Sequence, residues 1–217
     1  MSASTPKTQC ILQSWHRPAG AAAKATILPD GCRDLIVVEN VLGHRRAFVS
    51  PLDRAPREVN VEPSSRVWGL RLLPGTRIHG DLHELAQCSE PDLARYGASM
   101  IERPTNLQEA FDALAHSFTV RQAAQSCGVG ERSFSRWFNK HEVETPQFFL
   151  QLQRVRRAAR AVARWAGETG NLADIAFDFG YADQAHMMRA FRRWLGQTPA
   201  ALAACPNPLL FSLGVGD

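Results

Sequence analysis

The sequence predicts an α+β protein, with a small β-barrel or rolled sheet in the N-terminal half and an all-α module in the C-terminal part. Two observations support this class. Before Gly75, short runs of Val, Ile, Leu, Phe and Trp are separated by Pro, Gly and Asp, the pattern of strands joined by turns. After Leu107, apolar residues recur at helical spacing, and one stretch of sequence occurs twice.

The N-terminal half has room for about five to seven strands before Gly75. Helices are then expected over residues 78–87, 92–101 and 107–118. The segment RPTN at residues 103–106 reads as a linker followed by an N-cap. We therefore expect a β-rich domain over residues 1–104, a helical domain over residues 105–205 and a tail over residues 206–217.

The duplicated pattern occupies residues 120–146 and 172–199. In the first copy, VRQAAQSCG turns at residues 128–130 and continues as ERSFSRWFNKHEVETP. In the second, LADIAFDFG turns at residues 180–182 and continues as DQAHMMRAFRRWLGQTP. Gly128 and Gly180 lie 52 residues apart, whereas Arg136 and Arg189 lie 53 apart, so the second copy has one inserted residue. Because glycine supplies the left-handed conformation of a sharp turn, each copy predicts a helix-turn-helix.

Capping and chain-breaking residues frame both copies in the same way. Side-chain oxygens or acidic charge satisfy free amides at helix starts, and proline ends a helical segment. The first helices follow Thr119 and Asn171, the second helices open at Glu131 and Asp183, and Pro146 and Pro199 close the two copies.

The second helix of each copy has an apolar stripe and an outward face. The stripes are expected to point inward and consist of Phe134, Trp137 and Phe138 in one copy and Met187, Ala190, Phe191 and Trp194 in the other. The residues between them are small or polar groups of the kind that reach base edges in a major groove. On a lone helix such a face is usually only solvated. The duplication favours a recognition surface instead.

The stretch QFFLQLQRVRRAARAVARWAG joins the two copies. Its apolar positions 149, 152, 155, 158, 159, 162 and 165 follow a helical period, which predicts one long helix holding the two units apart. From Glu131 to Arg164 there are eight Lys or Arg and three Asp or Glu, a difference of +5, although the whole chain carries only +4. This local excess of positive charge favours binding to nucleic acid.

The second copy, LADIAFDFGYADQAHMMRAFRRWLGQTP, resembles the signature of the AraC/XylS family of bacterial transcriptional regulators, with Arg-x-Phe and Gly-x-Thr-Pro in their expected places. The resemblance covers about residues 107–203. It implies a seven-helix module whose two recognition helices enter successive major grooves on one face of duplex DNA. It also implies a regulator and not an enzyme, with RNA polymerase as a second partner.

The resemblance and the outward faces together give the candidate site. Arg136 and Arg189 match positions where the family places base-contacting arginines. The expected base-reading residues are Arg132, Ser133, Ser135, Arg136, Gln184, Ala185, Met188 and Arg189. The expected contacts to the DNA backbone are Arg121, Gln122, Lys140, Asn171, Arg192 and Arg193.

Three departures from the family pattern affect these expectations. HEVETP lacks the glycine that usually precedes the Ser/Thr-Pro ending, so the first recognition helix should end less regularly. Glu131 stands at the start of that helix, where it either repels phosphate or acts as a cap. His186, Met187 and Met188 favour apolar contact with thymine methyl groups in the second helix.

The N-terminal segments LPDGCRDLIVV and GLRLLPG resemble, less specifically, a small domain fused to this module in a subgroup of the family. That resemblance implies a sensor or dimerisation role, so a small-molecule effector and a homodimer both stay open. Asp34, Trp68 and Arg71 are candidates for a pocket inside the rolled sheet. The triplet at residues 29–31 is read as a tight turn.

Composition indicates the compartment in which the protein is expected. The chain has 217 residues, a pI near 9.0 and five cysteines, at positions 10, 32, 88, 127 and 205, without a CxxC pair. That usage favours a reducing compartment, and the absence of an apolar span or signal-peptide core leads us to expect a cytoplasmic protein that does not enter a membrane. Cys127 is read as a small core residue.

Other functions fit less well. His79 and His83 lie four residues apart but lack further ligands, so a solvated helix start is preferred to a metal site, and neither a metal nor a cofactor is expected. No catalytic or phosphate-binding motif occurs. Two alternatives stay open: a DNA-repair regulator with a methyl-acceptor cysteine, and a helical docking module that would use Phe148, Phe149 and Leu152.

Overall fold

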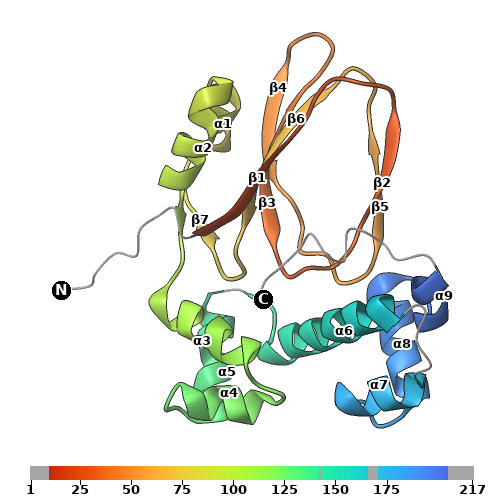
Figure 1. Ribbon diagram of the computed structural model, residues 1–217. Helices are drawn as coiled ribbons and strands as arrows, with labels where there is room; N and C mark the ends of the chain where they lie inside the picture. Colours follow the sequence, from red (N-terminus) through yellow and green to blue (C-terminus); the bar gives the residue numbers. More distant parts are fainter. Residues whose placement is uncertain (1–9, 142, 166–170, 205–217) are drawn as a thin grey trace. The chain divides into compact units, whose positions relative to one another are not determined.

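The computed structural model describes residues 10–141, 143–165 and 171–204. The chain forms two compact units. One consists of the described parts of residues 1–26, 31–52 and 58–109, and the other of residues 27–30, 53–57 and the described parts of 110–217. The first unit holds the β-sheets and a helix pair, and the second is mainly helical (Figure 1). The α+β class is therefore confirmed.

An antiparallel sheet of four strands, in the order β1-β6-β3-β4, forms the centre of the first unit. In the described residues before Gly75 there are six strands, within the expected number. The four are β1 (Ile11–Arg17), β6 (Arg66–Leu72), β3 (Arg33–Glu39) and β4 (Arg45–Val49). Two-stranded sheets are formed by β2 (Ala23–Ile27) with β5 (Arg57–Val61) and by β7 (Arg77–Ile78) with β8 (Ile101–Glu102).

Of the two forms expected for the N-terminal half, a small β-barrel or a rolled sheet, the barrel is wrong. Among the described strands, β2 and β5 pair only with each other, so β1 and β4 remain edges of the four-stranded sheet. A barrel needs an unbroken hydrogen-bonded ladder around its circumference. Each of the four chain segments that connect the two sheets contains proline, and proline cannot donate to a ladder; these residues are Pro18, Pro29, Pro51, Pro56 and Pro63.

One face of the four-stranded sheet is covered by α1 (Leu82–Gln87) and α2 (Glu90–Ser99), on the side away from β2 and β5 (Figure 1). Strand register pairs Leu35 with Leu70 and Val37 with Trp68 on this face. Leu85 and Leu93 of the helices are buried against it. At Gly97 the helix approaches so closely that a Cβ would lie 2.3 Å from Leu70 Cδ1, so only glycine fits without displacement.

The expected helix over residues 78–87 begins too early. Ile78 belongs to β7, Gly80 has φ +140°, and Asp81 is the N-cap of α1, with its carboxylate accepting from the His83 amide at 2.7 Å. His79 therefore precedes the helix, and His79 and His83 do not share a helical face. The helix expected over residues 92–101 is α2, which starts and ends two residues earlier, because Ile101 pairs with Ile78 instead.

Seven helices follow in the described part of the chain after Arg103, the number that the resemblance implies. They are α3 (Thr105–Ala115), α4 (Val120–Ser126), α5 (Glu131–Lys140), α6 (Pro146–Trp165), α7 (Leu172–Asp178), α8 (Gln184–Leu195) and α9 (Pro199–Ala204). The two prolines that close the copies also open new helices. Thr145 Oγ1 accepts from the Phe148 amide at 3.2 Å, and Thr198 Oγ1 accepts from Ala201 at 3.1 Å, so each Thr-Pro pair starts a helix.

Candidate nucleic-acid interface

Two helix-turn-helix units with the same turn geometry lie at the two ends of α6, one formed by α4 and α5 and the other by α7 and α8 (Figure 1). Gly128 has φ +68° and Gly180 has φ +71°, and a Cβ on either would meet no atom within 4 Å. Glycine is therefore required there by backbone conformation and not by space. The expectation of left-handed glycine turns is confirmed.

The backbone hydrogen bonds of the two turns also correspond. Gly128 donates to Gln125 O at 2.9 Å, as Gly180 does to Phe177 O at 2.9 Å. One residue later, Val129 donates to Ala124 O at 3.0 Å and Tyr181 donates to Ala176 O at 2.8 Å. These bonds satisfy carbonyls at the ends of α4 and α7 and fix the angle at which the next helix leaves.

Helix caps hold the first helices as the sequence predicts. Thr119 and Gln122 form a reciprocal capping box, in which Thr119 Oγ1 accepts from the Gln122 amide at 3.1 Å. Asn171 Oδ1 accepts from Ala173 at 3.0 Å at the start of α7. Asp183 caps α8 through the His186 amide at 2.6 Å. At α5 the N-cap is Gly130, so Glu131 lies in the first turn, where its negative charge interacts favourably with the helix dipole.

The ends of the recognition helices differ as expected. Helix α8 ends at Gly196 with φ +70°, a left-handed C-cap, whereas α5 ends at His141 with φ −105°. The missing glycine in HEVETP is the reason, because a residue with a Cβ avoids the left-handed region.

Side chains of opposite character occupy the two faces of α5. Phe134 and Phe138 are fully buried, and Trp137 is half-buried. Arg132, Arg136 and Lys140 are exposed at intervals of four residues, so they form one basic row along the helix. Arg132 and Arg136 have no hydrogen-bond or ion-pair partner among the described residues. Ser133 and Ser135 are half-buried beside this row.

Helix α8 repeats the arrangement with a more apolar start. Met187, Phe191 and Trp194 are buried. Ala185, Arg189, Arg192 and Arg193 are exposed, with Gln184 and Met188 half-buried next to them. Arg189 is without a polar partner in the described chain, while the Arg193 guanidinium lies 5.2 Å from the centre of the Trp194 ring. The outward face of α8 thus carries its positive charge from Arg189 onward.

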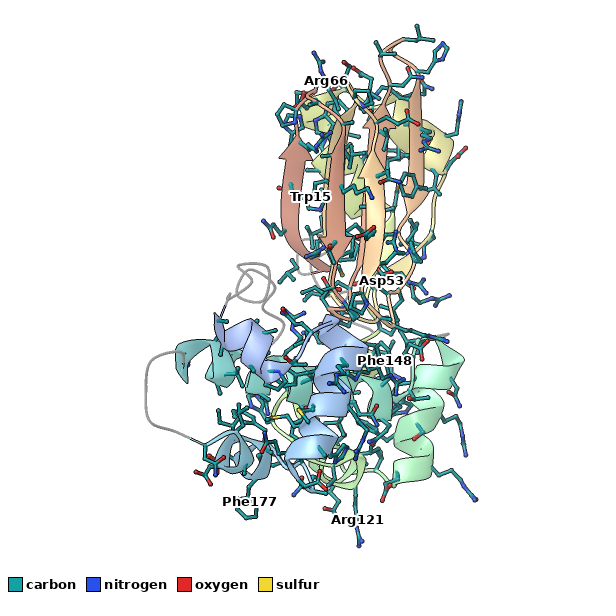
Figure 2. The ribbon with its side chains drawn as sticks, turned by 90° about the vertical axis from the view of Figure 1, so that its right-hand side faces the viewer. Trp15, Asp53, Arg66, Arg121, Phe148 and Phe177 are labelled. Atoms are coloured by element: carbon teal, nitrogen blue, oxygen red, sulfur yellow. The ribbon has the colours of Figure 1, made fainter. Side chains whose placement is uncertain are left out.

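The remaining candidates for backbone contact lie around the first helices. Arg121 of α4 is exposed and points out of the helical unit on the same side as Phe177 of α7 (Figure 2). The Gln122 side-chain oxygen accepts from the amides of Phe118 and Thr119, and the Asn171 oxygen accepts from Ala173. Gln122 and Asn171 therefore have only their side-chain NH₂ groups available to reach a phosphate.

An aromatic core connects both units to α6. Phe149 lies 4.7 Å from Phe111 of α3 and 6.1 Å from Phe138 of α5, measured between ring centres. On the other side, Phe148 lies 5.1 Å from Trp194 of α8. The apolar stripe expected on α6 is buried from Phe149 to Val162. Since Phe148, Phe149 and Leu152 are all buried, they do not form the exposed docking surface of the alternative interpretation.

The second turn has a polar feature that the first lacks. Tyr181 is buried, with the Arg154 guanidinium of α6 5.7 Å from its ring centre and His186 packed edge-on at 5.2 Å. Burial raises the pKa of Tyr181, opposed by the charge of Arg154. In the first unit the corresponding residue is Val129. Tyr181 thereby ties the second turn to the long helix.

The three N-terminal pocket candidates separate onto opposite faces of the sheet. Asp34 pairs with Arg71 in the strand register, and Arg71 Nε donates to Asp34 at 3.3 Å. Trp15 Nε1 donates to the same carboxylate at 2.9 Å. This buried ion pair is structurally satisfied. Trp68 pairs with Val37 and lies on the other face, below α1 and α2.

Two exposed aromatic residues are not among those that the sequence predicts for the site. Phe177 is 82% exposed on α7 and Phe118 is 60% exposed before α4. At the position that corresponds to Phe177 in the first unit stands Gln125, and comparing the two copies could have shown this exchange. Cys127 is half-buried at the C-cap of α4, so it is less buried than a core residue. The described residues contain no group of three potential metal ligands.

No helix in the described ranges has both the length and the apolar character that crossing a membrane requires. Helix α6 is long enough but carries five arginines.

Comparison with known proteins gives one family match. A model described as a helix-turn-helix domain matches residues 123–204. No curated protein matches the chain. The chain is also similar to a transcriptional regulator with an AraC-type DNA-binding domain from Chromobacterium violaceum, at 20% identity and a TM-score of 0.40, over 48% of this chain and 96% of that one.

A second similar structure is ToxT from Vibrio cholerae, at 7% identity and a TM-score of 0.43, over 88% of this chain and 97% of ToxT. A further ToxT structure, solved with an unsaturated fatty acid bound, has 9% identity and a TM-score of 0.39, with both chains fully covered. At these scores neither similarity assigns a residue or a ligand to this chain.

Proposed function

We propose that this chain is a DNA-binding transcriptional regulator of the AraC type, and that it reads two adjacent major grooves with α5 and α8. Its residues 123–204 match a model of a helix-turn-helix domain. The expectation that it is a regulator and not an enzyme agrees with that domain.

The observation that carries the proposal is the duplicated turn geometry at the two ends of one helix. Helix α6 has 20 residues, which corresponds to about 30 Å at 1.5 Å per residue. One turn of B-DNA is about 34 Å long. A rigid helix of nearly that length, packed against α5 through Phe149 and against α8 through Phe148, suits two recognition helices in successive grooves on one side of the duplex.

The outward faces suggest a division of roles. Arg136 and Arg189 are exposed and unpaired within the described chain, so each is available to donate two hydrogen bonds to guanine. Gln184 suits adenine, and Ala185 and Met188 suit thymine methyl groups. Arg132, Ser133 and Ser135 complete the reading face of α5. These roles are proposals that mutation can test.

Contacts to the DNA backbone should determine how DNA affinity depends on salt concentration. Arg121, Lys140, Arg192 and Arg193 are four exposed cations on or beside the recognition units. Each neutralised phosphate adds about −0.9 to the slope of log affinity against log salt concentration, so the four predict a slope of roughly −3.6. Gln122 and Asn171 add neutral hydrogen bonds to phosphate without changing that slope.

For the rest of the chain we propose that residues 1–104 act as a sensor or a dimer contact for the DNA-binding domain over residues 105–205, with residues 206–217 as a tail. A dimer contact raises the effective concentration of a second DNA-binding module. RNA polymerase is the proposed second partner, and the cytoplasm is the proposed compartment, since the DNA target is there.

Selection of bound duplexes from a random pool tests the proposal. Two recognition helices predict two short conserved blocks whose centres lie about 10 base pairs apart. In the same selection, Arg136→Ala should relax one block and Arg189→Ala the other. A single conserved block, or no enrichment at low salt, would refute two-groove reading.

A further inference from the structure

A cavity of about 250 Å³ lies in the first unit, between the four-stranded sheet and the helix pair α1 and α2. Leu35 and Leu70 line it from the sheet, and Leu85 and Leu93 line it from the helices. All four are buried. His16 and Glu90, which are exposed, also line it, so the cavity has apolar walls and an opening with polar groups.

The size of this cavity sets the size of an occupant. A cavity of 150 Å³ lined by leucine, isoleucine and phenylalanine holds benzene. A cavity of about 250 Å³ therefore has room for one substituted ring or two fused rings.

Trp68 provides the polar group. Its side chain lines the cavity and is only 9% exposed, yet Nε1 is buried without a hydrogen-bond partner among the described residues. Buried indole N–H groups normally have an acceptor, and leaving one unpaired is costly. Trp15, on the other face of the same sheet, shows the usual arrangement, because its Nε1 donates to Asp34 at 2.9 Å.

Charges near Trp68 argue for a neutral occupant. The Arg45 guanidinium lies 5.1 Å from the centre of the Trp68 ring and donates to the Cys88 carbonyl. Its Nε has no hydrogen-bond partner among the described residues, but the Glu39 carboxylate 3.6 Å away balances its charge, and Arg45 does not line the cavity. His16 stacks on the Trp68 ring at 5.4 Å with an interplanar angle of 23°. Since Glu90 adds a negative charge at the opening, an anion gains no unpaired cation there, and a buried charge is costly.

We propose that this cavity binds an uncharged, planar, mainly apolar molecule of one or two rings, whose acceptor atom takes the hydrogen bond of Trp68 Nε1. Binding itself is independent of the DNA interface. Only its use as an effector site rests on the sensor role proposed above.

Quinoline and naphthalene test the proposal as a matched pair, because they have the same shape and only quinoline has an acceptor nitrogen. The readout is the indole N–H signals of the ¹⁵N-labelled full-length chain, with Trp68→Phe identifying the Trp68 signal. We expect quinoline to shift that signal saturably and to bind about three- to tenfold more tightly than naphthalene, the range for one hydrogen bond. In Trp68→Phe the two affinities should become equal.

A second pair of variants tests whether quinoline binds in this cavity. Ala94 is an exposed residue that lines the cavity, so Ala94→Trp should fill it and lower quinoline affinity at least tenfold. Ala25→Trp, at an exposed position of β2, is the control and should bind as the unchanged chain does.

Equal affinity for the two compounds in the unchanged chain, or unchanged quinoline binding in Ala94→Trp, would overturn the proposal. DNA binding is measured on the same samples. Its failure alongside intact quinoline binding would count against the proposed function only, whereas intact DNA binding without quinoline binding would count against the cavity only.

Discussion

Arg189 and Arg192 form a matched pair on α8, because both are exposed, three residues apart, and proposed for different contacts. Replacing either with alanine removes a side chain that has no polar partner within the described chain. Surface changes of this kind alter the free energy of unfolding by less than about 0.5 kcal/mol. Any larger loss of DNA affinity therefore reports on the interface and not on folding.

The two variants should lose affinity in different ways. Arg189→Ala removes a two-pronged contact to one base, worth about 1–3 kcal/mol, which is a factor of about 5–160 at the selected site and little on scrambled DNA. Arg192→Ala removes one phosphate contact. One phosphate contact contributes about 0.9 to the slope of log affinity against log salt concentration. Losing it should therefore lower the affinity at 0.15 M salt roughly fivefold relative to its effect at 1 M, and equally for all DNA sequences.

Fluorescence anisotropy with labelled selected and scrambled duplexes, over a series of salt concentrations, separates these outcomes. The ratio of the two affinities should fall for Arg189→Ala and stay constant for Arg192→Ala, whose salt slope should become shallower by about 0.9. If Arg189→Ala weakened scrambled DNA as much as the selected site, its role as a base reader would be wrong.

Three further predictions concern stability and ionisation. Phe148→Ala removes the contact between α6 and Trp194 and should lower the free energy of unfolding, measured in urea, by about 3–5 kcal/mol. The control Phe118→Ala, at a 60% exposed position, should change it by less than about 0.5 kcal/mol. Equal effects of the two variants would contradict the aromatic link. Gly69→Ala places a Cβ 2.1 Å from the Trp15 indole, so it should lower the free energy of unfolding by about 1–3 kcal/mol and alter tryptophan fluorescence. A variant with unchanged stability and fluorescence would argue against that packing. Both tyrosines of the chain should ionise late: a hydrogen bond to Glu84 raises the pKa of Tyr96 to about 12, and burial raises that of Tyr181. The folded state then keeps two protons that the unfolded state releases near pH 10, so stability should fall as pH rises above 10, and absorbance at 295 nm should show tyrosinate near pH 10 only in unfolded protein.

The helix-turn-helix units could be predicted because their determinants are local. A left-handed glycine, a capping side chain and an apolar stripe act within about ten residues, and the second copy repeats all three. Thr119, Asn171 and Asp183 cap helices as expected. The expected helix over residues 78–87 starts too early because Gly80 and Asp81 form a local start signal that apolar periodicity does not reveal.

Long-range pairing could not be predicted in the same way. Nothing in the spacing of β2 and β5 shows that they pair with each other and not with the edges of the larger sheet. For the pocket candidates, alternation along β6 separates Trp68 from Arg71, which are three residues apart and therefore on opposite faces. Placing Trp68 at a cavity required knowing where α1 and α2 pack.

The most direct test of two-groove reading is the affinity of the selected duplex after five base pairs are inserted between its two conserved blocks. Half a turn of DNA moves one block to the opposite side, and α6 is a continuous helix that cannot follow it. Binding should fall to the level of scrambled DNA. An insertion of ten base pairs restores the side but adds about 34 Å, so binding should stay lost. Unchanged affinity after the five-base-pair insertion would contradict the account.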